Sequence, residues 1–209
     1  MRLKQTVPYY IVFITFFICA SCKHKNAAPS IDIVLRGNLE ISDKKARAIF
    51  ERGLRFIEEG DYGTARKRFF EANRECPNNP TILNAIGSTF SQTGNPDLGN
   101  TYFERALKID SNFINSYANF GASLNLTMRL DEAKQVLRLG LARDSKDSSN
   151  RSLLFLNLAN SYFLNKEYDS ALEFIDSTKR NAGHGRVYNL ALQAQSEVNI
   201  RMPQPATRR

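Results

Sequence analysis

A 34-residue period constrains this chain more strongly than any other feature of its sequence. Gly53, Gly87 and Gly121 follow one another at intervals of 34 residues. A bulky apolar residue precedes each glycine by four positions, and another follows it by three. A period of this length is typical of stacked repeats, in which each unit buries its apolar surface against its neighbours. We therefore expect a solenoid rather than a domain with one central core.

The second half of each unit repeats as well. A small residue lies twelve positions after each glycine, a phenylalanine or leucine four positions further, and a small residue three positions beyond that. These residues are Ala65, Phe69 and Ala72; Gly99, Phe103 and Ala106; and Ala133, Leu137 and Gly140. A fourth copy, displaced by 38 residues instead of 34, consists of Phe155, Ala159, Tyr162, Ala171 and Ile175. We expect the four additional residues in the connection that contains Ser145 to Asn150.

Spacings of three and four place these residues on one face of a helix, so each unit predicts two antiparallel helices. Small residues at their closest approach let the two backbones come together, and we expect Gly121 to lie where two helix backbones nearly touch. Three aspartates stand where the second helices begin, and we expect them to cap the free N–H groups there. They are Asp97, Asp131 and Asp169.

The pattern resembles the tetratricopeptide repeat (TPR), in which aromatic and small residues are followed by Ala-x-x-x-Phe and a closing proline. The resemblance covers residues 46–185, and the first copy carries Ala65, Phe69 and Pro77. The second copy departs from the pattern, with Ser111 in place of the proline. The resemblance implies an all-α fold, a right-handed α-α superhelix of about four helix pairs with a C-terminal capping helix.

The N-terminus carries an export signal. Arg2 and Lys4 precede the apolar run Tyr9–Ala20, which would reach about 18 Å as a helix against a hydrocarbon core of roughly 30 Å. The run is thus typical of a signal peptide, with a retained membrane anchor as the alternative. It ends in the sequence CASC at 19–22, which resembles a bacterial lipobox. That resemblance implies that Cys22 is acylated and begins the mature chain.

The predicted organisation follows from these two patterns. A signal peptide (1–21) precedes a lipidated tether (22–45), and a capping helix (186–200) precedes a flexible tail (201–209). The four repeats between them are 46–79, 80–113, 114–147 and 152–185.

Composition excludes several classes of function. Apolar residues make up 42% of the chain, which excludes a disordered protein. Three cysteines and two histidines exclude a four-thiolate or an all-histidine metal site. The sequence has no nucleophile motif and no phosphate-binding glycine loop, so we expect no catalytic residues, no cofactor and no metal. The net charge of +8 falls largely on the second helices with acids interspersed, which indicates a solvated outer face rather than nucleic-acid binding.

Function on such a scaffold is expected from a surface, and the first helices line the concave face of related solenoids. Five asparagines fall on these helices and form the predicted partner-binding groove: Asn84, Asn119, Asn125, Asn157 and Asn160. A carboxamide offers both a donor and an acceptor, so such a ladder is suited to the backbone of an extended peptide. The alternative is that these asparagines satisfy neighbouring helix ends or water.

These expectations combine into a membrane-anchored adaptor of the bacterial cell envelope that binds proteins or peptides. Lys23, His24 and Lys25 follow the lipobox cysteine without an acidic sorting residue, so we expect the outer membrane and a periplasm-facing array. The alternative is a regulatory or substrate-presenting subunit of an envelope enzyme, a protease or a cell-wall hydrolase. The sequence leaves the partner and the oligomeric state open.

Overall fold

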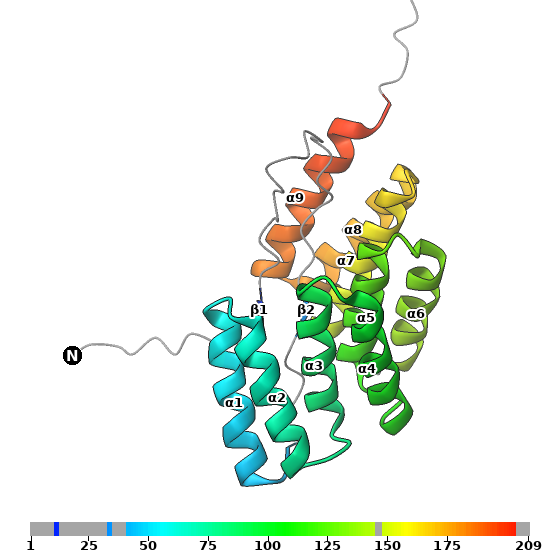
Figure 1. Ribbon diagram of the computed structural model, residues 1–209. Helices are drawn as coiled ribbons and strands as arrows, with labels where there is room; N and C mark the ends of the chain where they lie inside the picture. Colours follow the sequence, from blue (N-terminus) through cyan, green and yellow to red (C-terminus); the bar gives the residue numbers. More distant parts are fainter. Residues whose placement is uncertain (1–10, 13–32, 35–40, 145–147, 204–209) are drawn as a thin grey trace, which may run out of the picture.

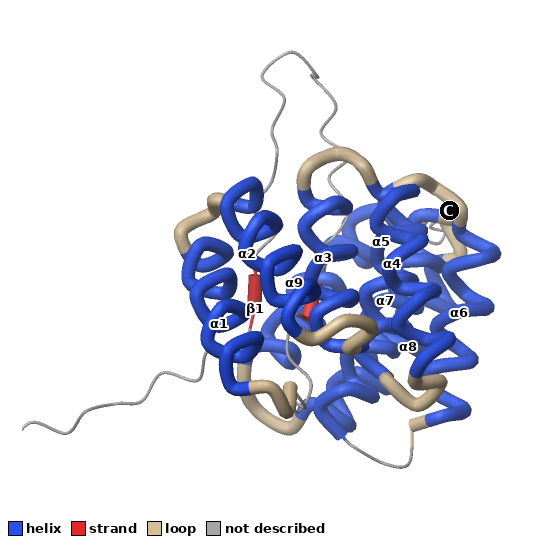
Figure 2. The backbone as a smooth tube through the Cα atoms, turned by 60° about the horizontal axis from the view of Figure 1, so that its bottom comes forward, coloured by secondary structure: helices blue, strands red, loops and turns tan. Residues whose placement is uncertain are grey.

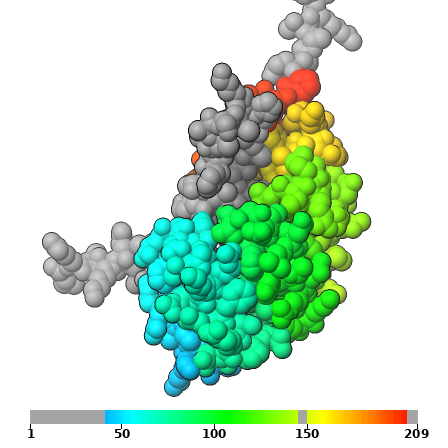
Figure 3. All heavy atoms as spheres, viewed as in Figure 1, coloured from blue at the N-terminus to red at the C-terminus, as the bar shows by residue number. Residues whose placement is uncertain are grey.

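The computed structural model describes residues 11–12, 33–34, 41–144 and 148–203. Within these ranges the chain forms nine α-helices and two strands of two residues each. The helices run as antiparallel pairs (Figure 1). The repeats follow one another along the molecule in chain order, as the colours of Figure 3 show. The predicted all-α superhelix of repeated helix pairs is confirmed.

Each repeat contributes a first and a second helix joined by a short loop (Figure 2). The first helices are α1 (Lys44–Glu58), α3 (Pro80–Gln92), α5 (Ile114–Leu126) and α7 (Ser148–Leu164). The second helices are α2 (Tyr62–Glu75), α4 (Pro96–Ile109), α6 (Leu130–Arg143) and α8 (Tyr168–Ala182). The last helix, α9 (Arg186–Arg201), packs against α8 and α7 and buries Ala191, Ala194 and Val198.

Side-chain caps begin the first three helices. Asp43 accepts a hydrogen bond from the backbone N–H of Ala46 at 2.7 Å, and Asp61 accepts one from Thr64 at 2.9 Å. Asn79 caps α3 in the same way, with Pro80 as the first helical residue. Such caps satisfy N–H groups that have no partner inside the helix.

The expectation that Asp97, Asp131 and Asp169 cap the second helices is wrong. Each lies in the first turn, one residue inside the helix, and α4, α6 and α8 have no side-chain hydrogen bond at their N-caps. Carboxylates in this turn still favour the helix through the positive end of its dipole.

The four additional residues of the fourth repeat lengthen a helix. α7 has 17 residues, whereas α3 and α5 have 13 each, and its Ser148–Asn150 segment is helical. The expected placement of the whole insertion in the connection is therefore wrong, because about one turn of it joins α7. Residues 145–147 lie outside the described part of the chain.

The core repeats with the same period as the sequence. A bulky side chain of each second helix packs over the glycine of the first helix, so that Phe69 covers Gly53 and Phe103 covers Gly87. A Cβ on Gly87 would lie 2.8 Å from Cε1 of Phe103. At Gly121 the three nearest atoms belong to the Leu137 side chain, so a Cβ there would meet that side chain first.

Two short strands accompany the helices. β1 (Ile11–Val12) pairs antiparallel with β2 (Ile33–Val34), and β2 lies against α5. β1 falls within the predicted signal peptide and β2 within the predicted tether, while Cys22 lies outside the described residues. No helix in the described ranges is long and apolar enough to cross a membrane.

Candidate functional site

The first helices of the second, third and fourth repeats share one lining, which we call the inner face. Each contributes four residues at spacings of three, four and three, which places them on one side of the helix. The inner face consists of Thr81, Asn84, Ser88 and Ser91 on α3; Asn115, Ala118, Ala122 and Asn125 on α5; and Leu153, Leu156, Asn160 and Phe163 on α7. All twelve are buried.

The chemistry of the inner face changes along the stack. α3 and α5 contribute only small or polar side chains to it, whereas α7 contributes Leu153, Leu156 and Phe163. At the other end of the stack, the equivalent positions of α1 include the buried Phe50 and Leu54. A polar centre is thus flanked by two apolar ends.

A hydrogen-bond network joins α3 to α5. Nδ2 of Asn119 donates to Oδ1 of Asn84 at 3.0 Å and to Oγ of Ser88 at 3.3 Å. Oγ of Ser116 donates to the same Asn84 oxygen at 3.2 Å. These buried groups are therefore used to hold two neighbouring first helices together.

A second network joins α5 to α7. Nδ2 of Asn125 donates to the carbonyl oxygen of Asn157, and Nδ2 of Asn157 donates to that of Ala118, both at 3.0 Å. Oγ of Ser161 donates to Oδ1 of Asn125 at 2.8 Å. Each helix thus donates a side-chain N–H to a backbone carbonyl oxygen of the other. These two hydrogen bonds fix the distance between the helices.

Four of the five predicted groove asparagines thus form hydrogen bonds with the interior of a neighbouring first helix, rather than with helix ends or water as the alternative had it. Asn119 and Asn157 directly follow Ala118 and Leu156 of the inner face, and consecutive helical residues do not share a face. This offset was a signal in the sequence that these two asparagines point between the helices.

Asn160 differs from the other four. Its side chain is 2% exposed, and neither Nδ2 nor Oδ1 has a hydrogen-bond partner among the described residues. Oδ1 of Asn115, also on the inner face, is buried without a partner as well. Buried polar groups are paired in the great majority of cases, so these two residues mark the part of the inner face with unused binding capacity.

Several basic residues expected on a solvated outer face connect adjacent repeats instead. Arg66 of α2 lies 4.5 Å from the Phe90 ring centre and donates to Oγ1 of Thr93. Lys134 of α6 lies 4.6 Å from the Tyr162 ring centre and bonds Oε1 of Glu167 at 2.8 Å. Arginine and lysine stems thereby cover aromatic surface between one repeat and the next.

Lys134 and Glu167 stabilise each other's charged forms. The pKa of Glu167 is lowered, first by the hydrogen bond from Lys134 and next by that from Asn165. Burial disfavours the charged form of Lys134, but the hydrogen bond and charge of Glu167 outweigh it and raise the pKa of Lys134. Both groups are charged at neutral pH, so the pair is an ion pair between the third and fourth repeats.

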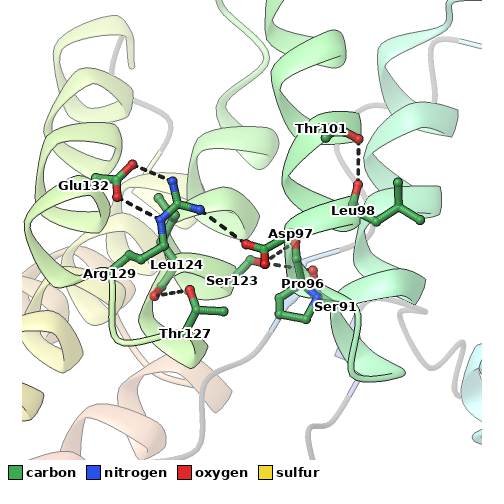
Figure 4. A network of polar contacts seen from close by, with 10 residues as sticks. All are labelled: Ser91, Pro96, Asp97, Leu98, Thr101, Ser123, Leu124, Thr127, Arg129 and Glu132. Carbon is green, nitrogen blue, oxygen red and sulfur yellow. Dashed lines mark hydrogen bonds and ion pairs between the residues drawn. The ribbon is translucent and has the colours of Figure 1, made fainter.

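A similar bridge joins the second and third repeats (Figure 4). Arg129 lies between Glu132, at 2.6 Å, and Asp97, at 3.4 Å. Beside it, the hydroxyls of Ser91 and Ser123 lie 3.0 Å apart, and Ser123 donates to the carbonyl oxygen of Pro96. Asp97, which does not cap its helix, therefore contributes to the contact between repeats.

The described residues contain no group of three or more histidine, cysteine or acidic residues that could hold a metal ion. Cys76 is a free, partly exposed thiol at the end of α2. In the described part of the chain, the inner-face residues with unpaired buried polar atoms are Asn115 and Asn160, and Asn100 of α4 has an unpaired carboxamide as well.

Comparison with known proteins finds one repeat of a known family in this chain. Residues 80–113, which contain α3 and α4, match the family model of the tetratricopeptide repeat. The RNA polymerase-associated protein CTR9 of Caenorhabditis elegans is 28% identical over 143 residues, which is 68% of this chain. The matched region spans only 12% of the length of CTR9.

Solved structures share the fold. The structure of pilF from Pseudomonas aeruginosa has a TM-score of 0.63 at 22% identity, covering 78% of this chain and 79% of that one. YrrB, a TPR protein with an unusual peptide-binding site, has a TM-score of 0.55 at 24% identity and covers 72% of this chain and 74% of its own. Residues 80–113 thus match one tetratricopeptide repeat, and the fold of the described residues resembles that of TPR proteins, which generally mediate protein–protein interactions.

Proposed function

We propose that this chain is a non-catalytic, membrane-anchored adaptor of the bacterial cell envelope that binds partner proteins or peptides on its inner face. Three observations support the proposal: the TPR fold, the lipobox-like sequence that ends at Cys22, and the unpaired buried carboxamide of Asn160. YrrB, which has the same fold, is a TPR protein with a peptide-binding site.

Asn160 carries the proposal. A buried polar group without a partner lowers stability by about 1–3 kcal/mol, and Asn160 has both a donor and an acceptor in that condition. Packing alone favours an apolar side chain at such a position. The backbone of an extended peptide offers one N–H and one C=O per residue, which matches the two unused groups of this carboxamide.

The other four asparagines have a supporting part in this function. Asn84 and Asn119 hold α3 against α5, while Asn125 and Asn157 hold α5 against α7. The four therefore hold the three first helices in the arrangement that forms the inner face.

The location belongs to the same proposal. A lipid on Cys22 would hold the array at a membrane, with at most the residues before α1 as a spacer. Lys23, His24 and Lys25 follow without an acidic residue, which supports the outer membrane and a periplasm-facing array over retention at the inner membrane or export to the surface.

Two asparagine variants test the function. The partner is captured by crosslinking the native lipoprotein, and capture is then compared between Asn160→Leu and Asn157→Leu. Because the Asn160 side chain has no hydrogen-bond partner among the described residues, Asn160→Leu is expected to weaken capture at least tenfold without lowering the thermal midpoint. Asn157→Leu breaks the bond to Ala118 and is expected to lower the midpoint. Full capture by a folded Asn160→Leu chain would contradict the proposal.

The captured partner also decides between the two functions considered. A structural protein of the envelope would agree with an adaptor. A protease or cell-wall hydrolase whose turnover changes on binding would instead make the chain a regulatory subunit.

A further inference from the structure

β2 is an extended segment of the chain that lies against a first helix of the repeats. It contacts α5, the central first helix, and comes from the sequence before the first repeat. In the sequence, Ile33 and Val34 belong to the aliphatic stretch IDIVL, which is typical of a strand and unlike the repeats.

The inner-face residues of α5 are already covered. Asn115, Ala118, Ala122 and Asn125 are each at most 2% exposed, although they lie on the side of α5 that an open groove would leave to solvent. Oδ1 of Asn115 is an acceptor without a partner. An extended backbone carries N–H donors that suit such an acceptor.

The position of β2 in the sequence favours this contact. Six residues, 35–40, separate Val34 from Ile41, which is fully buried at the start of the first repeat. A connection of this length spans about 25 Å at most, so β2 stays close to the repeats and its local concentration is of millimolar order. Cleavage before Cys22 would remove β1 from the chain and leave β2 in it.

We infer that β2 is a resident ligand of the inner face, so that a partner peptide binds by displacing it. The inference rests on the proposed function, because it describes how that same face is regulated. An extended aliphatic segment already lies on α5, and the partner segment that competes with it is therefore expected to be extended and aliphatic too.

The test uses the full chain and a fluorescent peptide of residues 29–38, PSIDIVLRGN, as the probe. Ile33→Asp and Val34→Asp together place two charges on this segment, and burying a charge opposes its transfer from water to the inner face. The probe is expected to bind this double variant at least tenfold more tightly than the unsubstituted chain, whose inner face is occupied. Fluorescence anisotropy measures both affinities, and circular dichroism verifies that the helices remain.

Two controls make the result specific. Ile200→Asp places the same charge on a residue of α9 that is 74% exposed, and it is expected to leave probe binding as in the unsubstituted chain. Asn115→Arg, added to the double variant, changes the first turn of α5 on the inner face and is expected to abolish probe binding. Equal affinity for the double variant and the unsubstituted chain, or no binding to either, would overturn the inference.

Failure of the resident ligand and failure of the proposed function give different results. If Asn160→Leu weakens partner capture while the probe does not distinguish the two chains, the function stands and the resident ligand does not. If the probe distinguishes them but no partner is captured, the resident ligand stands without the adaptor function.

Discussion

Gly87 of α3 and Gly99 of α4 bring two helix backbones into direct contact. A Cβ on Gly87 would lie 2.9 Å from the carbonyl oxygen of Gly99, and a Cβ on Gly99 would lie 2.7 Å from that of Gly87. Ser91 also lies against Gly99. The second repeat therefore contains the close backbone approach that the sequence led us to expect at Gly121.

Gly99→Ala is expected to lower stability. The new methyl group meets a backbone carbonyl that cannot rotate away, and overpacking of this kind costs about 1–3 kcal/mol. The gain in helix propensity, about 1 kcal/mol, offsets only part of this. Thermal unfolding followed by circular dichroism measures the change.

Gly63→Ala is the matched control. A Cβ on Gly63, in the first turn of α2, would meet only Oδ1 of Asp61, at an ordinary 3.5 Å. The thermal midpoint of Gly63→Ala is expected to be unchanged or higher. A midpoint for Gly99→Ala as high as that of Gly63→Ala would show that the two backbones do not approach closely.

Asn119→Leu is expected to destabilise the chain by about 1–3 kcal/mol, because it removes a buried donor and leaves Asn84 and Ser88 with fewer bonds. Chemical denaturation measures the loss. Asn160→Leu, which breaks no internal bond, is the comparison and is expected to match or exceed the unsubstituted chain in stability. The prediction is contradicted if the two variants unfold at the same denaturant concentration.

The ion pair between Lys134 and Glu167 makes the stability of the fold depend on pH. Because the pKa of Glu167 is lowered in the folded chain, the unfolded chain takes up the proton first as the pH falls. The stabilisation is fully present above the ordinary value of 4.5 and is lost as the pH falls through the lowered value.

Glu167→Gln is therefore expected to lower the thermal midpoint at pH 7 more than at pH 3. Glu173→Gln, which removes an exposed carboxylate from α8, the helix that begins directly after Glu167, is the control and is expected to have a small effect at both pH values. An equal effect of Glu167→Gln at the two pH values would mean that the carboxylate charge does not stabilise the contact between repeats.

The helix pairs could be predicted because their cause is local and periodic. The spacing from Gly53 to Phe69 recurs in each repeat and reports a contact between two adjacent helices. The partners of Asn119 could not be predicted in the same way, because they lie 31 and 35 residues away and depend on how α3 and α5 pack. β2 lies outside the period, so no repeated pattern indicated its contact with α5.

The last prediction concerns Cys22, which lies outside the described residues. Because the thiol is the site of acylation implied by the lipobox resemblance, Cys22→Ala is expected to abolish incorporation of labelled palmitate. The substitution should also release the protein from membranes or leave it as an uncleaved precursor, since cleavage of the signal depends on acylation of Cys22. Cys76→Ala is the control: it changes a thiol at the end of α2 and is expected to keep full labelling. Normal palmitate labelling of the Cys22→Ala chain would rule out the lipid anchor at this residue and, with it, this route to the membrane.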